Sequence, residues 1–314
     1  MKYYGRRIIF YIITVWAAVS LNFFLPRLMP GDARSIFIDK LVRRGGEITP
    51  AMEHSIDLIF GADGSSMWSQ YWRYWDNIFH WDLGVSVTKF PAPVTQLIGQ
   101  ALPWTLILVG IATVISFILG VGIGAYAGWK RGTAADAIIP FMTLLQSLPY
   151  FWLALIFVSI FSVGLGWFPI IGGYSLRDFP GGPEMSWEFI GSAIYHGLLP
   201  AITIIIASVG GWVMGMRNMM VSTLSEDYVT TAEAKGLTKL RIFTWYATRN
   251  AALPSMAAFG ITLGFVVAGS IVMQDKDFAL MQGVFLVITL TVLAANFIMD
   301  LVYGLIDPRA RANV

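Results

Sequence analysis

The sequence predicts an all-α, polytopic membrane protein with six transmembrane helices, and two observations indicate this class. Hydrophobic residues make up 56% of the 314 residues and charged residues only 13%, and the mean hydropathy is +0.67. A soluble domain carries about a quarter of its residues charged. In addition, six apolar stretches reach the length of about 20 residues that crosses roughly 30 Å of hydrocarbon. Most of the chain is therefore expected to face lipid or other apolar helices.

The six predicted spans follow one another along most of the chain. The third is long enough to be kinked, and Pro149 inside it supplies a physical cause, because proline removes a helical hydrogen bond. The spans run approximately over residues 8–28, 103–129, 135–166, 198–220, 254–273 and 284–306.

The basic residues predict the orientation, because cytoplasmic loops carry an excess of lysine and arginine. With both termini in the cytoplasm, the short outer loops hold only Arg177 and Lys276. The segment between the first two spans is long enough to escape this rule. The cytoplasmic side then holds Lys2, Arg6, Arg7, Lys130, Arg131, Arg217, Lys235, Lys239, Arg241, Arg249, Arg309 and Arg311.

Several classes of function find no support in the residues. The net charge of +2 and the absence of cysteine disfavour nucleic-acid binding and thiolate chemistry. No phosphate-binding P-loop motif is present, so we expect no ATP site in this chain. We also expect no catalytic residue and no bound metal or cofactor. The histidines are not paired at metal-ligand spacing, and the few ionisable residues near the spans are expected to reach water. The histidines are His54, His80 and His196, and the ionisable residues near the spans are Asp136, Arg217 and Asp300.

The loop between the fourth and fifth spans holds the most informative pattern. Ser225 is expected to cap a helix whose first turn carries Glu226 and Asp227, since acidic groups stabilise a helix N-terminus. Lys235 falls in the last turn, and Gly236 fits the left-handed position that follows a helix.

A second helix is expected to follow the glycine. Thr238 caps it, it runs toward Asn250, and Pro254 then opens the fifth span. The small side chains of Ala232 and Ala234 would let another protein approach the first helix closely. By pattern alone, an amphipathic connector lying on the membrane explains the loop equally well.

The residues of this loop resemble the coupling loop of binding-protein-dependent ABC transporter permeases, in particular the dipeptide/oligopeptide class. The matching runs are Glu226-Asp227-Tyr228-Val229, Thr231-Ala232-x-Ala234-Lys235-Gly236-Leu237 and Arg249-Asn250-Ala251-x-x-Pro254. Further matches are Arg27-Leu28-x-Pro30-Gly31-Asp32, Asp82-Leu83-Gly84-x-Ser86 and Asp307-Pro308-Arg309. At the start of the loop, Thr230-Thr231-Ala232 replaces the Glu-Ala-Ala of the general motif.

The resemblance implies a type I ABC importer permease fold in a prokaryotic cytoplasmic (inner) membrane. The expected partners are a second homologous permease subunit, an extracytoplasmic substrate-binding protein and two cytoplasmic ATPase subunits, which would hold ATP and Mg. The cargo implied is di- or oligopeptides; oligosaccharides remain an alternative, as does a self-contained secondary transporter or channel. The implied ATPase-contact residues are Glu226, Asp227, Tyr228, Thr231, Ala232, Ala234, Lys235, Gly236 and Leu237.

One departure from the family pattern concerns the region after the fifth span. Relatives carry an extracytoplasmic segment with a Phe-x-x-Pro-Gly core there, whereas this sequence passes directly from Gln274 to Asp275. Because both flanks match the family, we interpret this junction as the place of a missing segment.

Polar residues within the predicted spans are candidates for the translocation pathway, although such residues often bond within their own helix. These candidates are Gln146, Ser147, Pro149, Thr203, Ser208 and Asn296. Small residues four apart suit close helix packing, either within one bundle or against a second permease. They are Gly120/Gly124/Gly128, Gly211/Gly215 and Gly260/Gly264.

Three regions follow along the chain. Residues 1–28 form the N-terminus and first span. Residues 29–98 form an extracytoplasmic segment, and residues 99–314 a five-helix core with the coupling loop at 221–252. The outer segment is rich in aromatic side chains, which suit either a helix at the lipid headgroups or a docking surface. They are Trp68, Tyr71, Trp72, Tyr74, Trp75, Phe79 and Trp81.

Overall fold

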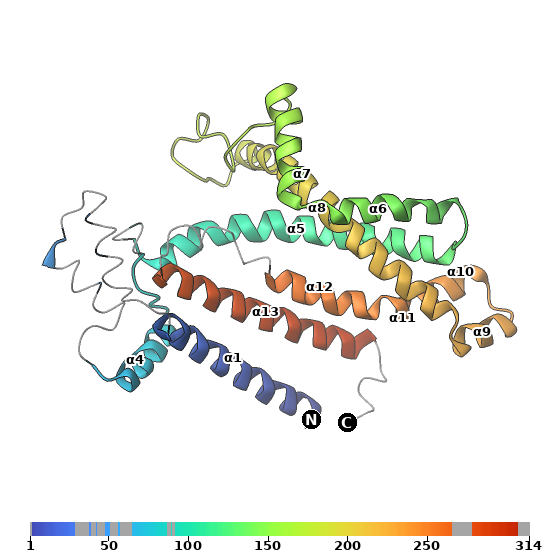
Figure 1. Cartoon of the computed structure of the whole chain (residues 1–314), viewed down its shortest axis with the longest axis horizontal. Helices are drawn as coiled ribbons and strands as arrows, with labels where there is room; N and C mark the ends of the chain where they lie inside the picture. The colour runs from blue at the N-terminus through green and yellow to red at the C-terminus, as the bar shows by residue number, and fades with distance from the viewer. Residues whose placement is uncertain are drawn as a thin grey trace. The chain divides into compact units, whose positions relative to one another are not determined.

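The computed structural model confirms an all-α protein (Figure 1). It describes residues 2–28, 38, 42, 48–50, 56, 65–86, 89, 92–265 and 278–306. Within these ranges no strand is present, and the only β-type pairing is an isolated bridge between Val85 and Pro93. The junction between Gln274 and Asp275 lies outside the described residues.

The helices differ in length, and two π-helical turns accompany them. The α-helices are α1 Lys2–Leu28, α4 Met67–Phe79, α5 Val94–Trp129, α6 Ile138–Ser147, α7 Tyr150–Phe157, α8 Trp187–Leu224, α9 Asp227–Ala234, α10 Lys239–Arg241, α11 Arg249–Ala251, α12 Leu253–Phe265 and α13 Phe278–Ile306. The remaining turns are η1 Ala134–Ala137 (3₁₀), η2 Val158–Gly164 (π) and η3 Ile242–Thr248 (π).

Three of the described helices are long and apolar enough to cross a membrane, namely Val94–Trp129, Trp187–Leu224 and Gln282–Asp300. The bent pair Ala134–Ser147 and Tyr150–Gly164 adds a fourth if it counts as one span. The apolar parts of α1 and α12, at Ile8–Phe24 and Leu253–Leu263, are shorter. The predicted count of six is therefore not confirmed; the second half of the fifth predicted span falls at residues 266–273, outside the described part.

The predicted kink at Pro149 is confirmed. The helical segments on either side of it are bent by 92°. Leu148 has extended backbone, with ψ 126°, as expected for a residue that precedes proline. The Pro149 carbonyl then accepts hydrogen bonds from the N–H groups of Trp152 (2.9 Å) and Leu153 (3.3 Å), which begins α7.

The chain forms two compact units, one built from residues 1–103, 267–294 and 311–314 and the other from 104–266 and 295–310. In the first unit, aromatic contacts and hydrogen bonds hold α4 against α1. The hydroxyls of Ser20 and Tyr71 lie 2.7 Å apart, and Tyr71 stacks on Phe24. The Asn22 amide donates to the Tyr74 hydroxyl (3.1 Å) and to the Gln282 carbonyl (2.9 Å).

The aromatic side chains of the outer segment thus divide between two environments. Tyr71 is buried against α1, and Tyr74 and Trp75 are half-buried. Trp68, Trp72, Phe79 and Trp81 are exposed. The prediction that the exposed group meets lipid headgroups or a docking protein stays a prediction.

In the second unit, α5 and α8 pack closely along a row of glycines. A Cβ atom added at Gly124 would lie 2.9 Å from Met216 Cβ, and one added at Gly128 would lie 2.7 Å from Met220 Cβ. Such distances leave no room for a side chain, so α5 contributes bare backbone to the contact. The glycine row therefore serves packing within this chain, one of the two uses that the sequence left open. By contrast, Gly215 has no atom near its vacant Cβ position.

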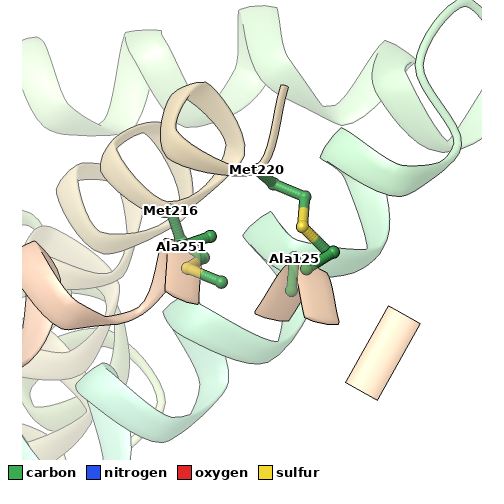
Figure 2. Packing of buried hydrophobic residues seen from close by; sticks show 5 residues of the cluster. Ala125, Met216, Met220 and Ala251 are labelled. Carbon is green, nitrogen blue, oxygen red and sulfur yellow. The ribbon is translucent and has the colours of Figure 1, made fainter. Parts of the chain in front are cut away.

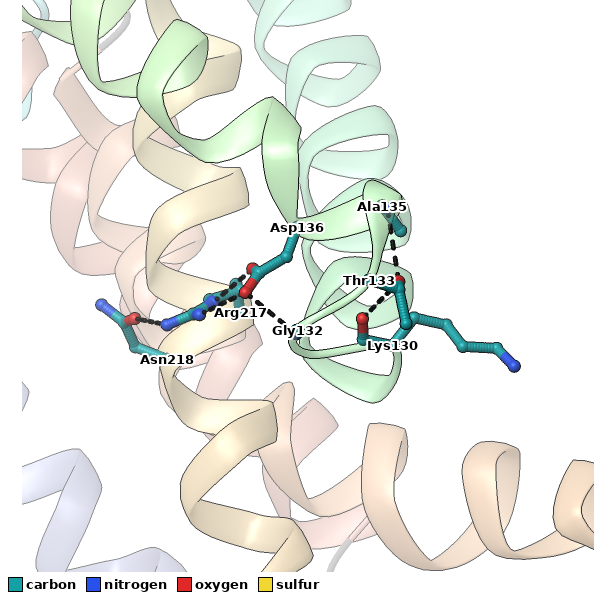
Figure 3. Close-up of polar contacts among 7 residues, drawn as sticks. All are labelled: Lys130, Gly132, Thr133, Ala135, Asp136, Arg217 and Asn218. Carbon is teal, nitrogen blue, oxygen red and sulfur yellow. Dashed lines mark hydrogen bonds and ion pairs between the residues drawn. The ribbon is translucent and has the colours of Figure 1, made fainter.

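An ion pair joins the short turn after α5 to α8 (Figure 3). The Arg217 guanidinium donates from Nε to Asp136 Oδ1 (3.1 Å) and from Nη2 to Asp136 Oδ2 (3.0 Å). The Gly132 N–H also donates to Oδ2 (3.3 Å). The two side chains are only 20% and 22% exposed. The sequence placed both residues where they would reach water; the structure shows instead that they bind each other.

We expect Gly124→Ala to destabilise the protein and Gly122→Ala to stabilise it. Overpacking of a tight contact costs about 1–3 kcal/mol, whereas alanine replaces glycine in an open helix position with a gain of roughly 0.5–1 kcal/mol. Gly122 lies on the same helix with no atom near its Cβ position, so it is a matched control. Thermal unfolding of both variants in detergent measures the difference. Equal shifts would contradict the close contact between α5 and α8.

We expect Asp136→Arg and Arg217→Asp each to lower the melting temperature, because each leaves a largely buried charge beside a like charge. The double swap should recover part of the loss, since the opposite charges face each other again. Arg177→Asp, which reverses the charge of an exposed arginine, should have little effect. If the loss in the double variant equals the sum of the two single losses, the pair does not stabilise the fold.

Candidate functional site

The loop between α8 and α12 begins with α9, and its start differs from the prediction. Glu226, not Ser225, is the N-cap, and its side chain makes no capping hydrogen bond. Helix α8 continues to Leu224, so Ser225 ends that helix instead, and its hydroxyl donates to the Ser222 carbonyl (2.7 Å). Asp227 still lies in the first turn of α9, where its charge stabilises the helix N-terminus.

The end of α9 confirms the predicted role of Gly236. Its φ is +72°, in the left-handed region that favours glycine. The Gly236 N–H donates to the Glu233 carbonyl (2.8 Å), and the Leu237 N–H donates to the Ala232 carbonyl (3.3 Å). These two bonds are the Schellman arrangement that ends many helices. Gly236 thereby reverses the chain at a fixed angle.

A second helical segment then runs back toward α12; we refer to α10, η3 and α11 together as the return helix. Its predicted cap is confirmed, because the Thr238 hydroxyl accepts a hydrogen bond from the Arg241 N–H (3.4 Å). The π-helical turn η3 in its middle was not predicted. The return helix ends one residue before α12, which begins at Leu253.

A small apolar cluster fixes α9 to the return helix. Val229 and Ala232 of α9 are buried against Ile242, and Trp129 and Leu237 pack around them. The sequence assigned both Ala232 and Ala234 to a partner surface, and the structure separates them. Ala232 is 2% exposed and belongs to the contact inside the chain, whereas Ala234 is exposed.

The return helix is in turn fixed to the α5–α8 contact. Figure 2 shows Met216 and Met220 of α8 beside Ala125 of α5 and Ala251 of α11, all of them buried. Ala247 of η3 completes this cluster. The position of α9 is therefore determined by the glycine row through the return helix.

The outward face of α9 is mostly polar, and acidic side chains outnumber basic ones on it. Tyr228 and Leu237 are half-buried at its edge. The exposed residues on and beside α9 are Glu226, Asp227, Thr230, Thr231, Glu233, Ala234, Lys235 and Gly236. This arrangement has no nucleophile–base pair or metal cluster, and among the described residues of the whole chain no group of three metal-ligating side chains occurs. A rigid, exposed helix of this kind is suited to contact with another protein.

The candidate pathway residues are distributed over α6, the bend after it, α8 and α13. Gln146, Ser147 and Pro149 are exposed at the bend between α6 and α7. A Cβ atom added at Gly210 of α8 would lie 3.5 Å from Gln146 Cβ, so this part of α6 packs on α8.

The candidate pathway hydroxyls bond locally. Ser147 donates to the Thr143 carbonyl (2.8 Å), Thr203 to that of Leu199 (2.9 Å) and Ser208 to that of Ile204 (2.6 Å). Thr203 is buried, whereas Asn296 is half-buried. A role for any of these residues in the pathway stays a prediction.

Some residues that position the loop were not identified from the sequence. Trp129 meets Phe243 of the return helix with ring centroids 5.4 Å apart, and Asp136 binds Arg217. Trp129 ends a predicted span, a place where tryptophan is common for other reasons. Asp136 and Arg217 stand 81 residues apart, and no local pattern links them.

Comparisons with known proteins identify the relatives of this chain. Residues 120–275 match the family model described as binding-protein-dependent transport system inner membrane component. The di/tripeptide transport system permease protein DppB of Pseudomonas aeruginosa is 31% identical over 99% of both chains. The dipeptide transport system permease protein DppB of Escherichia coli K12 is 29% identical over 99% of both. The oligopeptide transport system permease protein AppB of Bacillus subtilis is 27% identical over 98% of both.

The alignment with the Pseudomonas protein spans 342 positions, more than the 314 residues of this chain. Part of the relative therefore has no counterpart here. The family model covers α8, α9, the return helix and α12 in one continuous match. With a relative 31% identical along nearly its whole length, this chain belongs to the family of binding-protein-dependent transport system inner membrane components.

Proposed function

We propose that this chain is one permease subunit of an ABC importer for di- or oligopeptides. The observation that carries the proposal is the rigid, exposed α9, in a chain related along nearly its full length to peptide permeases. In the proposed complex, a second permease completes the pathway and an extracytoplasmic binding protein delivers the cargo. Two ATPase subunits, which hold ATP and Mg, contact α9 in the cytoplasm, where both termini also lie.

The packing of the loop supports a mechanical role. For ATP to change the membrane conformation, the ATPase contact must differ in free energy between two states of the permease. If the ATPase contacted a mobile loop, the loop would move and the membrane helices would stay in place. Here α9 is fixed to the return helix by Val229, Ala232 and Ile242, and the return helix is fixed to α5 and α8. A displacement of α9 is therefore transmitted to the ends of two long membrane helices.

Cysteine substitutions test the ATPase contact directly, because the chain has no cysteine of its own. Ala234→Cys on the exposed face should react rapidly with a polar maleimide, and bound ATPase subunits should suppress the reaction. Ala232→Cys, two residues away and buried, should react slowly in either state. If the ATPase subunits co-purify with the permease and yet leave the reaction of Ala234→Cys unchanged, α9 is not their binding site.

The turn after α9 gives a functional test in proteoliposomes containing the whole complex. A residue other than glycine in the left-handed region loses about 1–2 kcal/mol, and asparagine loses less than others. An added Cβ at Gly236 would meet no atom, so a substitution there destabilises the turn only through the backbone conformation. We expect Gly236→Val to abolish ATP-driven peptide uptake while membrane insertion is retained, and Gly236→Asn to keep most of the uptake.

Unchanged uptake by Gly236→Val would overturn the assignment of the turn. In the same assay, uptake by the permease without ATPase subunits would identify a self-contained transporter or channel instead. If an oligosaccharide-loaded binding protein stimulated ATP hydrolysis and a peptide-loaded one did not, the cargo would be an oligosaccharide and not a peptide.

A further inference from the structure

We propose that the return helix lies in the headgroup layer of the cytoplasmic leaflet and binds anionic phospholipid. In this arrangement, α9 takes the ATPase contact and the return helix takes the lipid. The inference rests on the proposed function for the side of the membrane on which the loop lies. Its other premises are the charge, the register and the connection of the return helix.

The two helices of the loop differ in charge. Glu226, Asp227 and Glu233 are on or beside α9 together with one basic residue, Lys235, and all four are exposed. The return helix holds Lys239, Arg241 and Arg249, also exposed. No aspartate or glutamate occurs between Glu233 and Asp275 in the whole chain. The surface of the return helix is therefore complementary to an anionic partner.

The register of the return helix separates an apolar inner row from a mixed outer row. Its buried residues Ile242, Ala247 and Ala251 are spaced by five and then four residues, because the π-helical turn η3 carries i to i+5 hydrogen bonds. Leu240, Trp245 and Arg249 each lie two residues before one of these buried residues, so they have the same spacing and form the outer row. The π-helical turn thus keeps one face against α5 and α8 and aligns a second face outward.

The outer row combines large apolar side chains with cations. Leu240 is 72% exposed and Trp245 is 64% exposed, and Lys239 and Arg241 flank Leu240 in the sequence. Tryptophan is enriched where a membrane meets water, since its ring lies among the headgroups. Lysine and arginine near the cytoplasmic surface are attracted to anionic lipid within a Debye length. A helix with both features is typical of one that lies in the interface plane.

The connection to α12 places the return helix at this depth. Only Ala252 separates α11 from the apolar helix α12, and Trp129, which contacts Phe243, ends the long apolar helix α5. Both neighbours are thus ends of apolar helices. A protein partner would have to reach the outer row at the level of the headgroups, which makes lipid the favoured occupant.

Spin labels test the placement in the reconstituted complex, because the chain lacks cysteine. Thr244→Cys, next to Trp245 in the sequence, reports on the surroundings of the outer row, and Thr230→Cys on α9 is a matched control; both threonines are exposed. Accessibility to oxygen, which partitions into lipid, is compared with accessibility to a water-soluble nickel chelate. Measurements are made in vesicles of phosphatidylcholine with and without phosphatidylglycerol, and with and without ATPase subunits.

We expect the label at residue 244 to favour oxygen over nickel, and to keep this ratio when ATPase subunits bind. The ratio should fall in vesicles without phosphatidylglycerol, and also in the triple variant Lys239→Gln/Arg241→Gln/Arg249→Gln in anionic vesicles. The label at residue 230 should favour nickel and lose that access when ATPase subunits bind.

Two results would overturn the placement in the headgroup layer, and a third would overturn the preference for anionic lipid. One is a label at residue 244 that favours nickel in every vesicle, which means that the outer row lies in water. The other is a label that loses nickel access only on ATPase binding, which means that the outer row is a protein contact. An unchanged oxygen-to-nickel ratio between the two vesicle types would overturn the preference for anionic lipid. Failure at residue 230 alone would count against the proposed function and not against the lipid contact.

Discussion

The close approach of α5 and α8 is the contact on which the functional loop depends. Gly120, Gly124 and Gly128 leave the backbone of α5 bare at this contact, so side chains of α8 pack directly on that backbone. Met216 and Met220 of α8 form one buried cluster with Ala125 of α5 and with Ala247 and Ala251 of the return helix. In lipid, where the hydrophobic effect does not drive helices together, such packing is a main source of stability.

Two further layers, the return helix and then α9, pack on this contact. The return helix lies on α5 and α8, and α9 lies on the return helix through Val229 and Ala232. Each layer adds a different surface: the first is apolar, the second carries cations with exposed Leu240 and Trp245, and the third carries carboxylates. Under the two proposals made above, a single loop would meet lipid through one surface and a protein through another. The turn at Gly236 is the point at which the two surfaces separate.

Local signals predicted much of this loop correctly. Proline before Tyr150, glycine at residue 236 and threonine at residue 238 act through their own backbone or nearest neighbours, and the structure places each as expected. The error at Ser225 has the same origin. A serine before an acidic turn suits the start of α9, but it equally suits the end of α8, and the length of α8 decided the matter. The count of six spans, which depends on length, is likewise not confirmed by the described helices.

The amino-acid pattern alone was enough for the membrane class and for the Thr238 cap and the Gly236 turn that shape the loop, because hydropathy and backbone preference act over short distances. Which side chains are available to a partner depends on how the helices pack. Ala232 and Ala234 are both alanines on the same helix, yet Ala232 is buried against Ile242 and Ala234 is exposed. Asp136 and Arg217 are far apart in the chain and bind each other once α8 lies beside the end of α5. Burial and ion pairing depend on what folds against a residue, and that information is not local.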